Sequence, residues 1–270
     1  MDNLQKKLNE TEQYIIEHVE NRPDIAITLG SGLNKFAKQI DNRIELPCED
    51  IPNYPVPGIQ GHEGQLVFGN IENVNILGIQ GRSHYYEGRK LKEIVFPIDV
   101  MNQLDISQLI LTNAAGGINK NFKPTDLVLI DSYLNFTQIK KPFLDSETSP
   151  FNKTLNSLTQ KLAREKDIKL KKGTYCWTTG PNFETRKEIE VARKLGADMV
   201  GMSTVPELQR AAYLGQNVIG ISLITNMAAG IDENELSHQD VQSTAQKAEK
   251  KFYSLMLYLI KQLYKESESK

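Results

Sequence analysis

Most side chains in this sequence that can do chemistry stand just after an apolar run. Polar or glycine-rich residues follow the run 25–29 at 30–33, the run 76–79 at 80–84, the run 109–111 at 112–117, the run 199–202 at 203–204 and the run 218–224 at 225–226. In open α/β sheets, ligands bind beyond the carboxyl ends of the strands. We therefore expect these polar segments to converge on one site.

Ser31 lies in the segment GSGLNK, directly after the first of these runs. The segment lacks the third glycine of the dinucleotide-binding GxGxxG motif and the GxxxxGK[ST] spacing of a P-loop. In the functional interpretation, its small residues let backbone N–H groups and the Ser31 hydroxyl approach an anion at a helix N-terminus. The alternative is a tight turn between a strand and a helix.

Ser203 offers a second hydroxyl to an anion. In GMSTV, residues 201–205, a valine stands where a nucleophile elbow needs its last glycine, so that motif is not met. Thr204 and Glu207 instead fit a capping box that opens a helix. Ser203 would then lie beside a helix dipole, where it either meets an anion or only helps to cap the helix.

Arg82 and His84 stand two residues apart in GRSHYYEG. They can present a cation and a hydrogen-bonding ring to phosphate, or they can form surface ion pairs only. No two of the four histidines have the spacing of a local metal-binding pair such as HxxxH, and Cys48 and Cys176 form no CxxC motif. We therefore expect no metal site.

Glu184 precedes a second predicted capping box, formed by Thr185 and Glu188, and follows Phe183. Its carboxylate either favours the helix dipole or, if it is partly buried, binds a donor such as a ring N–H of a ligand. The combined set of hydroxyls, an arginine, a histidine, a carboxylate and an amide lacks an evident nucleophile-plus-base pair. Such a set suits transfer to an anion such as phosphate, where positioning and leaving-group stabilisation carry the catalysis.

The expected fold class is α/β, with residues 1–270 forming a single domain around a central mixed, largely parallel twisted sheet flanked by helices. The apolar runs, which include 127–130, are typical of strands buried on both faces. Apolar spacing predicts helices over 4–19, 153–166, 188–195 and 241–263. Residues from about 264 to 270 are expected to form a frayed tail.

Composition limits the class of protein. A chain of 270 residues with 39% hydrophobic residues and a formal charge of −2 is typical of a soluble globular protein and argues against a nucleic-acid partner. Two distant cysteines fit a reducing, cytoplasmic location. The first residues lack the apolar region of a secretory signal, and the apolar run at 255–260 is too short to span a bilayer. We expect a cytoplasmic protein without a membrane partner.

Seven segments, in order along the chain, resemble those of the trimeric, low-molecular-mass purine nucleoside phosphorylase family. They are GSGL at 30–33, QGHEG at 60–64, GRSHYYEG at 81–88, NAAGG at 113–117, GPNFET at 180–185, GMSTVPE at 201–207 and LITNMAAG at 223–230, with SHQDV at 237–241 as a looser match. The resemblance implies a nucleoside phosphorylase-like fold, a homotrimer and a role in purine salvage. The implied reaction is phosphorolysis of 6-oxopurine (2′-deoxy)ribonucleosides, such as inosine and guanosine, to the free base and α-(deoxy)ribose 1-phosphate.

The resemblance also implies a role for each matching residue. Phosphate would meet Ser31, Arg82, His84, Ser203 and the backbone N–H of Ala114, with His62 covering it. The ribose would be lined by Tyr86, Met202 and His238. Phe183 would pack against the base, Glu184 would bind its N1–H and N2 edge, and Asn226 would bind its N7/O6 edge.

The implied catalytic residues are Asn226, Glu184 and His84. Negative charge builds on the purine as the C1′–N9 bond breaks, so an amide that strengthens its hydrogen bond to N7 during that change lowers the barrier preferentially. Phosphate supplies both the counter-charge and the nucleophile. The resemblance therefore implies no metal and no organic cofactor.

Two departures from the family pattern and two rival functions stay open. Met227 replaces a lysine that some members have after the key asparagine. The segment from Asp131 to Phe151 is short beside members whose loop sends a phenylalanine into a neighbouring site, a role open to Phe143 or Phe151. One rival is a methylthioadenosine phosphorylase, which carries Asp at the base-reading position because a 6-amino group must donate; Asn226 and Ser203 weigh against it. The other is a nucleoside-binding protein without catalysis, against which the full set of phosphate residues counts.

Overall fold

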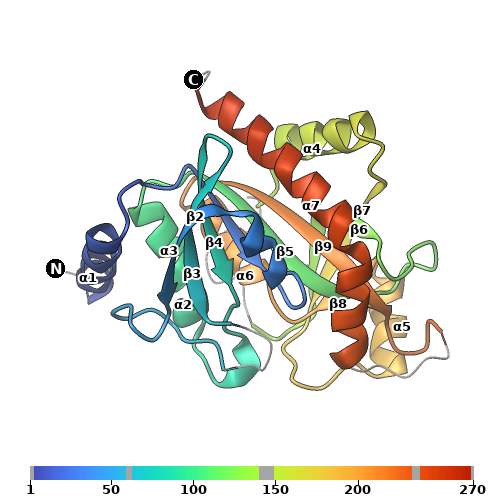
Figure 1. Cartoon of the computed structure of the whole chain (residues 1–270). Coiled ribbons are helices and arrows are strands. Elements are labelled where there is room, and N and C mark those ends of the chain that lie inside the picture. Colours follow the sequence, from blue (N-terminus) through green and yellow to red (C-terminus); the bar gives the residue numbers. More distant parts are fainter. Residues whose placement is uncertain (1–2, 59–62, 140–148, 233–237, 269–270) are drawn as a thin grey trace.

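A nine-stranded mixed sheet forms the centre of the structure, a computed structural model that describes residues 3–58, 63–139, 149–232 and 238–268 (Figure 1). The strands are β1 (Ile25–Leu29), β2 (Asp41–Pro47), β3 (Gln65–Ile71), β4 (Val74–Gln80), β5 (Gln108–Gly117), β6 (Leu127–Asn135), β7 (Leu170–Trp177), β8 (Met199–Gly201) and β9 (Asn217–Met227). The helices are α1 (Asn3–His18), α2 (Leu91–Ile94), α3 (Phe96–Gln103), α4 (Lys153–Glu165), α5 (Arg186–Lys194), α6 (Val205–Tyr213) and α7 (His238–Glu268), with 3₁₀ turns η1 (Asn34–Gln39) and η2 (Tyr85–Glu87).

Part of the sheet closes into a ring. Strand β5 pairs with β9 and β8, β9 pairs with β6, β6 with β7, and β7 with β8. From β5 the sheet continues outward through β1, β4, β3 and β2. Parallel and antiparallel pairs both occur, and helices flank the sheet, so the predicted α/β fold with a mixed sheet is confirmed.

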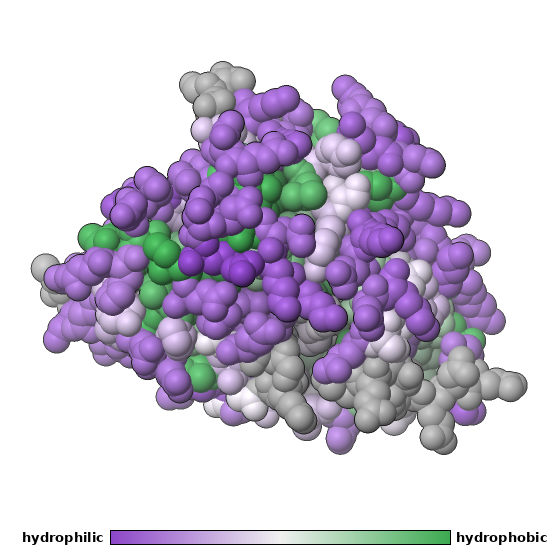
Figure 2. All heavy atoms as spheres, in the orientation of Figure 1, coloured by the Kyte–Doolittle hydropathy of each residue, from purple (hydrophilic) through white to green (hydrophobic). Residues whose placement is uncertain are grey.

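Helices cover both faces because alternate residues of the central strands point to opposite sides. Ile25 and Ile27 of β1 belong to a buried cluster with Phe252 of α7, whereas Ala26 belongs to a second cluster with Ile98 of α3. Helix α7 crosses one face of the sheet beside α4, and α1 lies at the far end of the molecule (Figure 1). On the face shown in Figure 2, hydrophilic residues predominate and apolar residues occupy smaller areas between them.

Gly30 directly follows β1 and lies so close to β5 that no side chain would fit. A Cβ atom at this position would lie 2.6 Å from the Cα atom of Asn113. The Gly30 N–H donates to the Thr112 hydroxyl at 3.2 Å, and that hydroxyl donates to the Thr28 carbonyl at 2.8 Å. This contact brings the loop after β1 against β5, and Ser31 and Ala114 line one cavity.

The six predicted strands are present, but several end elsewhere than expected. Strands β5 and β9 run on through 112–117 and 225–226, the polar segments that were expected to follow them. Ring closure explains the extension, because Gly116 pairs with both Val200 and Asn226. Strand β8 ends at Gly201, which leaves Met202 outside it. Strands β2, β3 and β7 were not predicted.

Helix α7 is also longer than predicted. It continues to Glu268, through the segment from about 264 that was expected to fray. Leu259 and Leu263 extend its buried stripe, and Tyr264 packs against the same cluster. Within the described residues, no helix combines the length and the apolar character needed to cross a membrane.

Candidate active site

A cavity of about 220 Å³ lies where the loops after β1, β4 and β8 meet the ends of β5 and β9. Ten of the predicted site residues line it: Ser31, Arg82, His84, Tyr86, Ala114, Phe183, Glu184, Met202, Ser203 and Asn226. His62 lies outside the described residues, and so does Phe143. His238 begins α7, but its side chain is not among those described.

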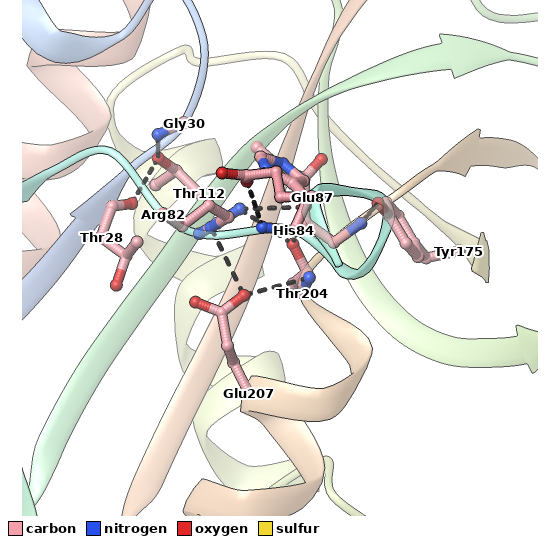
Figure 3. A network of polar contacts seen from close by, with 11 residues as sticks. Thr28, Gly30, Arg82, His84, Glu87, Thr112, Tyr175, Thr204 and Glu207 are labelled. Atoms are coloured by element: carbon pink, nitrogen blue, oxygen red, sulfur yellow. Dashed lines mark hydrogen bonds and ion pairs between the residues drawn. The ribbon is translucent and has the colours of Figure 1, made fainter. Parts of the chain in front are cut away.

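One end of the cavity is built on the buried side chain of Arg82 (Figure 3). Its Nη1 atom donates to the hydroxyls of Ser203 at 3.0 Å and Thr204 at 3.1 Å. Its Nε atom lies 3.4 Å from Oε2 of Glu207, and both side chains are 5% exposed. A guanidinium, two hydroxyls and the N-terminus of α6 therefore meet at this end, a combination suited to an anion.

Thr204 takes part in the predicted capping box, but its hydroxyl faces other partners. Its backbone N–H donates to the Glu207 carboxylate at 3.1 Å, as the capping-box pattern requires. Its hydroxyl accepts from Arg82 and also from Nδ2 of Asn113 at 3.0 Å. The hydroxyl thus belongs to the network behind the cavity wall. The capping pattern in the sequence gave no sign of this second role.

His84 is held by Glu87 at the cavity edge. Oε1 of Glu87 accepts from the His84 backbone N–H at 2.5 Å and lies 3.2 Å from Nδ1 of the ring, and Oε2 accepts from the Gly58 N–H at 2.7 Å. Burial raises the pKa of Glu87, but the hydrogen bonds from His84 and Gly58 and the His84 charge outweigh it, so the pKa is lowered. The contacts fix the ring orientation of His84.

Tyr86 stacks on the His84 ring, with 5.0 Å between the ring centroids. Burial, with a smaller contribution from the Glu87 charge, raises the pKa of Tyr86 to about 12. Tyr86 is therefore a neutral phenol at physiological pH, able to donate a hydrogen bond into the cavity that it lines.

The cavity wall also carries a carboxylate and an amide. Thr178, just after β7, donates its hydroxyl proton to Oε1 of Glu184 at 2.6 Å. The Thr225 hydroxyl donates to Oδ1 of Asn226 at 2.8 Å, and Nδ2 of Asn226 donates to the Met227 carbonyl at 3.2 Å. Both groups are thus oriented by neighbours before any ligand arrives.

Phe183, Met227 and Phe151, three residues that the sequence singled out, differ in exposure and surroundings. Phe183 lines the cavity and is 50% exposed. Met227 is 8% exposed and packs in an apolar cluster with Ala115 and Ile224. Phe151 packs on the ring of Tyr133, with 6.2 Å between the centroids. Within the described chain, Met227 therefore belongs to the core.

Comparison with known proteins gives the same family from sequence and from structure. The Phosphorylase superfamily model matches residues 24–261. Purine nucleoside phosphorylase 1 of Bacillus subtilis (strain 168) is 38% identical over 269 residues, covering 96% of this chain and 99% of that protein. Purine nucleoside phosphorylase of Mus musculus is 36% identical over 248 residues, covering 86% of each chain. The chain belongs to the purine nucleoside phosphorylase family.

Solved structures agree with this assignment. Isoform 2 of purine nucleoside phosphorylase from Schistosoma mansoni, in complex with cytosine and ribose-1-phosphate, has a TM-score of 0.85 and 34% identity, covering 94% of this chain and 95% of that one. The predicted enzyme class, purine nucleoside phosphorylase, is therefore confirmed. Within the described residues, no group of three or more His, Cys, Asp or Glu side chains is arranged to hold a metal ion.

Sequence reasoning missed the residues that support the site of this phosphorylase. Thr178 orients Glu184, Asn113 contacts Thr204, and Glu207 pairs with Arg82. Asn113 is the first residue of the NAAGG segment, which gives no sign of its partner Thr204. Thr178 directly follows β7, which was not predicted, and the sequence pattern of Glu207 indicates a helix cap only. Their partners are distant in the chain, so no local pattern could reveal the pairs.

We expect the Glu87 carboxylate to contribute stability at neutral pH. A carboxyl with a lowered native pKa stabilises the fold above its unfolded pKa, about 4.5, and loses that contribution as pH falls through the native pKa. Glu87→Gln should therefore lower the free energy of unfolding at pH 7 by roughly 1–3 kcal/mol, with a smaller difference near pH 4. Denaturant titrations at both pH values, with the exposed Glu20→Gln as the control, measure it. An equal difference at both pH values would contradict this account.

Proposed function

We propose that the enzyme catalyses the phosphorolysis of 6-oxopurine (2′-deoxy)ribonucleosides, such as inosine and guanosine, to the purine base and α-(deoxy)ribose 1-phosphate. The observation that carries this proposal is the polarity of one cavity. Arg82 donates to Ser203, and Ser203 lines one cavity together with Ser31, the Glu184 carboxylate and the Asn226 amide. A nucleoside glycosidic bond placed between these hydroxyls and the carboxylate and amide would face phosphate on one side and base-binding groups on the other.

Phosphate is the co-substrate at the Arg82 end in this proposal. Ser31, His84, Ser203 and the backbone N–H of Ala114 line the cavity together with Arg82 and supply the remaining donors. His62 covers the phosphate in the same scheme. In support, the similar enzyme from Schistosoma mansoni was solved with ribose-1-phosphate, the kind of product that this reaction yields.

The sugar and base occupy the rest of the cavity in the proposed complex. Tyr86, Met202 and His238 contact the ribose, and Phe183 stacks on the purine. Glu184, with Oε1 held by Thr178, keeps a second oxygen to accept from the base N1–H. Asn226 donates to N7 as negative charge builds on the leaving purine, so its hydrogen bond is strongest in the transition state.

Phosphate supplies the nucleophile and the counter-charge for an oxocarbenium-like ribose, so the proposed reaction needs no metal and no organic cofactor. Positioning and electrostatic stabilisation then account for the catalysis. His84 is placed by Glu87 at the phosphate end, where it can hydrogen-bond the anion.

Asn226 argues for a 6-oxopurine substrate over the rival methylthioadenosine. Its amide nitrogen can donate to N7 while the amide also faces the 6-substituent, whereas a 6-amino group calls for an acceptor such as Asp. Related enzymes from Schistosoma mansoni were solved with adenosine and with hypoxanthine, at 29% and 28% identity. The proposed preference of this chain for a 6-oxo over a 6-amino purine therefore rests on Asn226.

A coupled assay with inosine separates an enzyme from a nucleoside-binding protein. We expect hypoxanthine to form only when phosphate or arsenate is present, and EDTA to leave the rate unchanged. A protein that binds inosine but releases no base at any phosphate concentration would be a binding protein. Activity lost with EDTA and restored by a divalent ion would contradict the metal-free scheme.

Asn226→Asp should shift selectivity from inosine toward adenosine. An ionised Asp accepts only, so it suits a 6-amino group and repels a 6-oxo group. One mismatched buried polar pair costs about 1–3 kcal/mol, which corresponds to roughly a ten- to hundredfold change in the ratio of kcat/KM for the two nucleosides. The exposed Asn73→Asp serves as the matched control and should leave the ratio unchanged. The same ratio in folded Asn226→Asp would mean that Asn226 does not read the 6-position.

We also propose a cyclic homotrimer with active sites near subunit boundaries, on the strength of the family resemblance. Light scattering should then give three times the 30.5 kDa of one chain. A fully active monomer at assay concentration would contradict it. The cytoplasmic location stays a prediction.

A further inference from the structure

Thr204 contacts three side chains at the end of the cavity that is built on Arg82, but Thr204 does not line the cavity itself. It is 0% exposed, and its hydroxyl oxygen lies 3.1 Å from Nη1 of Arg82, 3.0 Å from Nδ2 of Asn113 and 2.9 Å from the hydroxyl oxygen of Ser203. Ser203 does line the cavity. The buried hydroxyl of Thr204 therefore contacts a residue that lines the cavity, and Figure 3 shows Thr204 close to Arg82 and Glu207.

The direction of each proton in this network follows from counting donors and acceptors. A hydroxyl has one proton to donate and two lone pairs that accept. Both lone pairs of Thr204 are taken, because Arg82 and Asn113 can only donate through the atoms that contact it. The Thr204 proton is thus left to donate to Ser203.

The same count fixes the proton of Ser203. Its oxygen accepts from Nη1 of Arg82 at 3.0 Å and from Thr204 at 2.9 Å, which fills both lone pairs. Its own proton can then only be donated, either to the Tyr175 hydroxyl, with which the Ser203 side chain also forms a hydrogen bond, or to a ligand in the cavity that Ser203 lines. A ligand at this end meets Ser203 as a donor and never as an acceptor.

An unusual backbone turn makes this arrangement possible. Thr204 has φ 71° and ψ −44°, rare for a β-branched residue, and the Val205 N–H donates to the Ser203 carbonyl at 2.8 Å. These are the features of a γ-turn with positive φ at its central residue, a strained conformation. The turn holds the hydroxyls of two consecutive residues in contact, whereas successive side chains of an extended chain point to opposite sides.

We propose that Thr204 is a positioning residue that makes Ser203 a dedicated hydrogen-bond donor to the anion. This inference rests on the proposed function, in which that anion is phosphate. A donor-only hydroxyl favours an oxygen with its lone pairs free, so it favours the deprotonated oxygens of a phosphate dianion. Thr204 would thereby act on phosphate affinity without touching phosphate.

Three substitutions of Thr204 test the proposal in steady-state phosphorolysis of inosine. Thr204→Val keeps the shape and removes the hydroxyl, so we expect the KM for phosphate to rise about ten- to hundredfold, with the KM for inosine changed less than about threefold. Thr204→Ser retains the hydroxyl and should restore a phosphate KM within about threefold of wild type. Thr204→Gly lacks the hydroxyl but accepts positive φ, so it carries the same test if Thr204→Val does not fold.

A double-mutant cycle identifies the residue through which Thr204 acts. In a Ser203→Ala background, Thr204→Val should raise the phosphate KM by less than about threefold further. The control is Thr159→Val in α4, which also removes a buried threonine hydroxyl, one bonded to the Leu155 carbonyl, and should leave the phosphate KM unchanged.

Other results would contradict either the role of Thr204 or the proposed function. An unchanged phosphate KM in Thr204→Val or Thr204→Gly, or a full effect that persists in the Ser203→Ala background, would overturn the inference while the proposed function stands. A wild-type enzyme whose rate does not depend on phosphate would overturn the proposed function, and the inference with it.

Discussion

The buried ion pair with Glu207 stabilises the Arg82 guanidinium inside this protein. A buried guanidinium without a partner is strongly destabilising, and removing one member of a buried pair costs about 3–5 kcal/mol. Here the two side chains are each 5% exposed, and the carboxylate also accepts the Thr204 N–H at the start of α6. The Glu207 carboxylate therefore both neutralises Arg82 and caps the start of α6. The ion pair joins the end of β4 to α6, and the anion end of the cavity is built around it.

The balance of charge in this pair affects how the cavity can hold an anion. The charge of Arg82 is already balanced by the Glu207 carboxylate, so affinity for an anion has to come largely from hydrogen-bond donors whose direction is fixed. The strained turn at Thr204 and the contact of Gly30 with β5 both help to fix such donors, since each holds backbone and hydroxyl groups in place at the cavity wall. Strain of this kind, roughly 1–3 kcal/mol, persists only where the surroundings over-determine it.

Local patterns in the sequence predicted the parts of this fold that depend on neighbours along the chain. Apolar runs gave the central strands, and the Thr185 and Glu188 capping box is present, with the Glu188 N–H donating to the Thr185 hydroxyl at 3.3 Å. The rule that ligands bind beyond strand ends predicted that residues such as Ser31 and Asn226 would meet at one cavity. Distant pairs left no such signal: Thr178 with Glu184 depends on an unpredicted strand, and ring closure decides where β5 and β9 end.

Closure of the ring also bears on how the protein avoids aggregation. Each strand of the ring pairs with two others over at least part of its length, whereas among the described strands β2 pairs with β3 alone. That strand is irregular and charged: its pairing with β3 shifts between Asp41 and Ile44, Arg43 and Glu45 lie 3.6 Å apart on it, and Pro47 ends it. Bulges, charges and proline are the features that keep a foreign strand from adding to an edge. Copies of this chain are therefore guarded against joining sheet to sheet through β2.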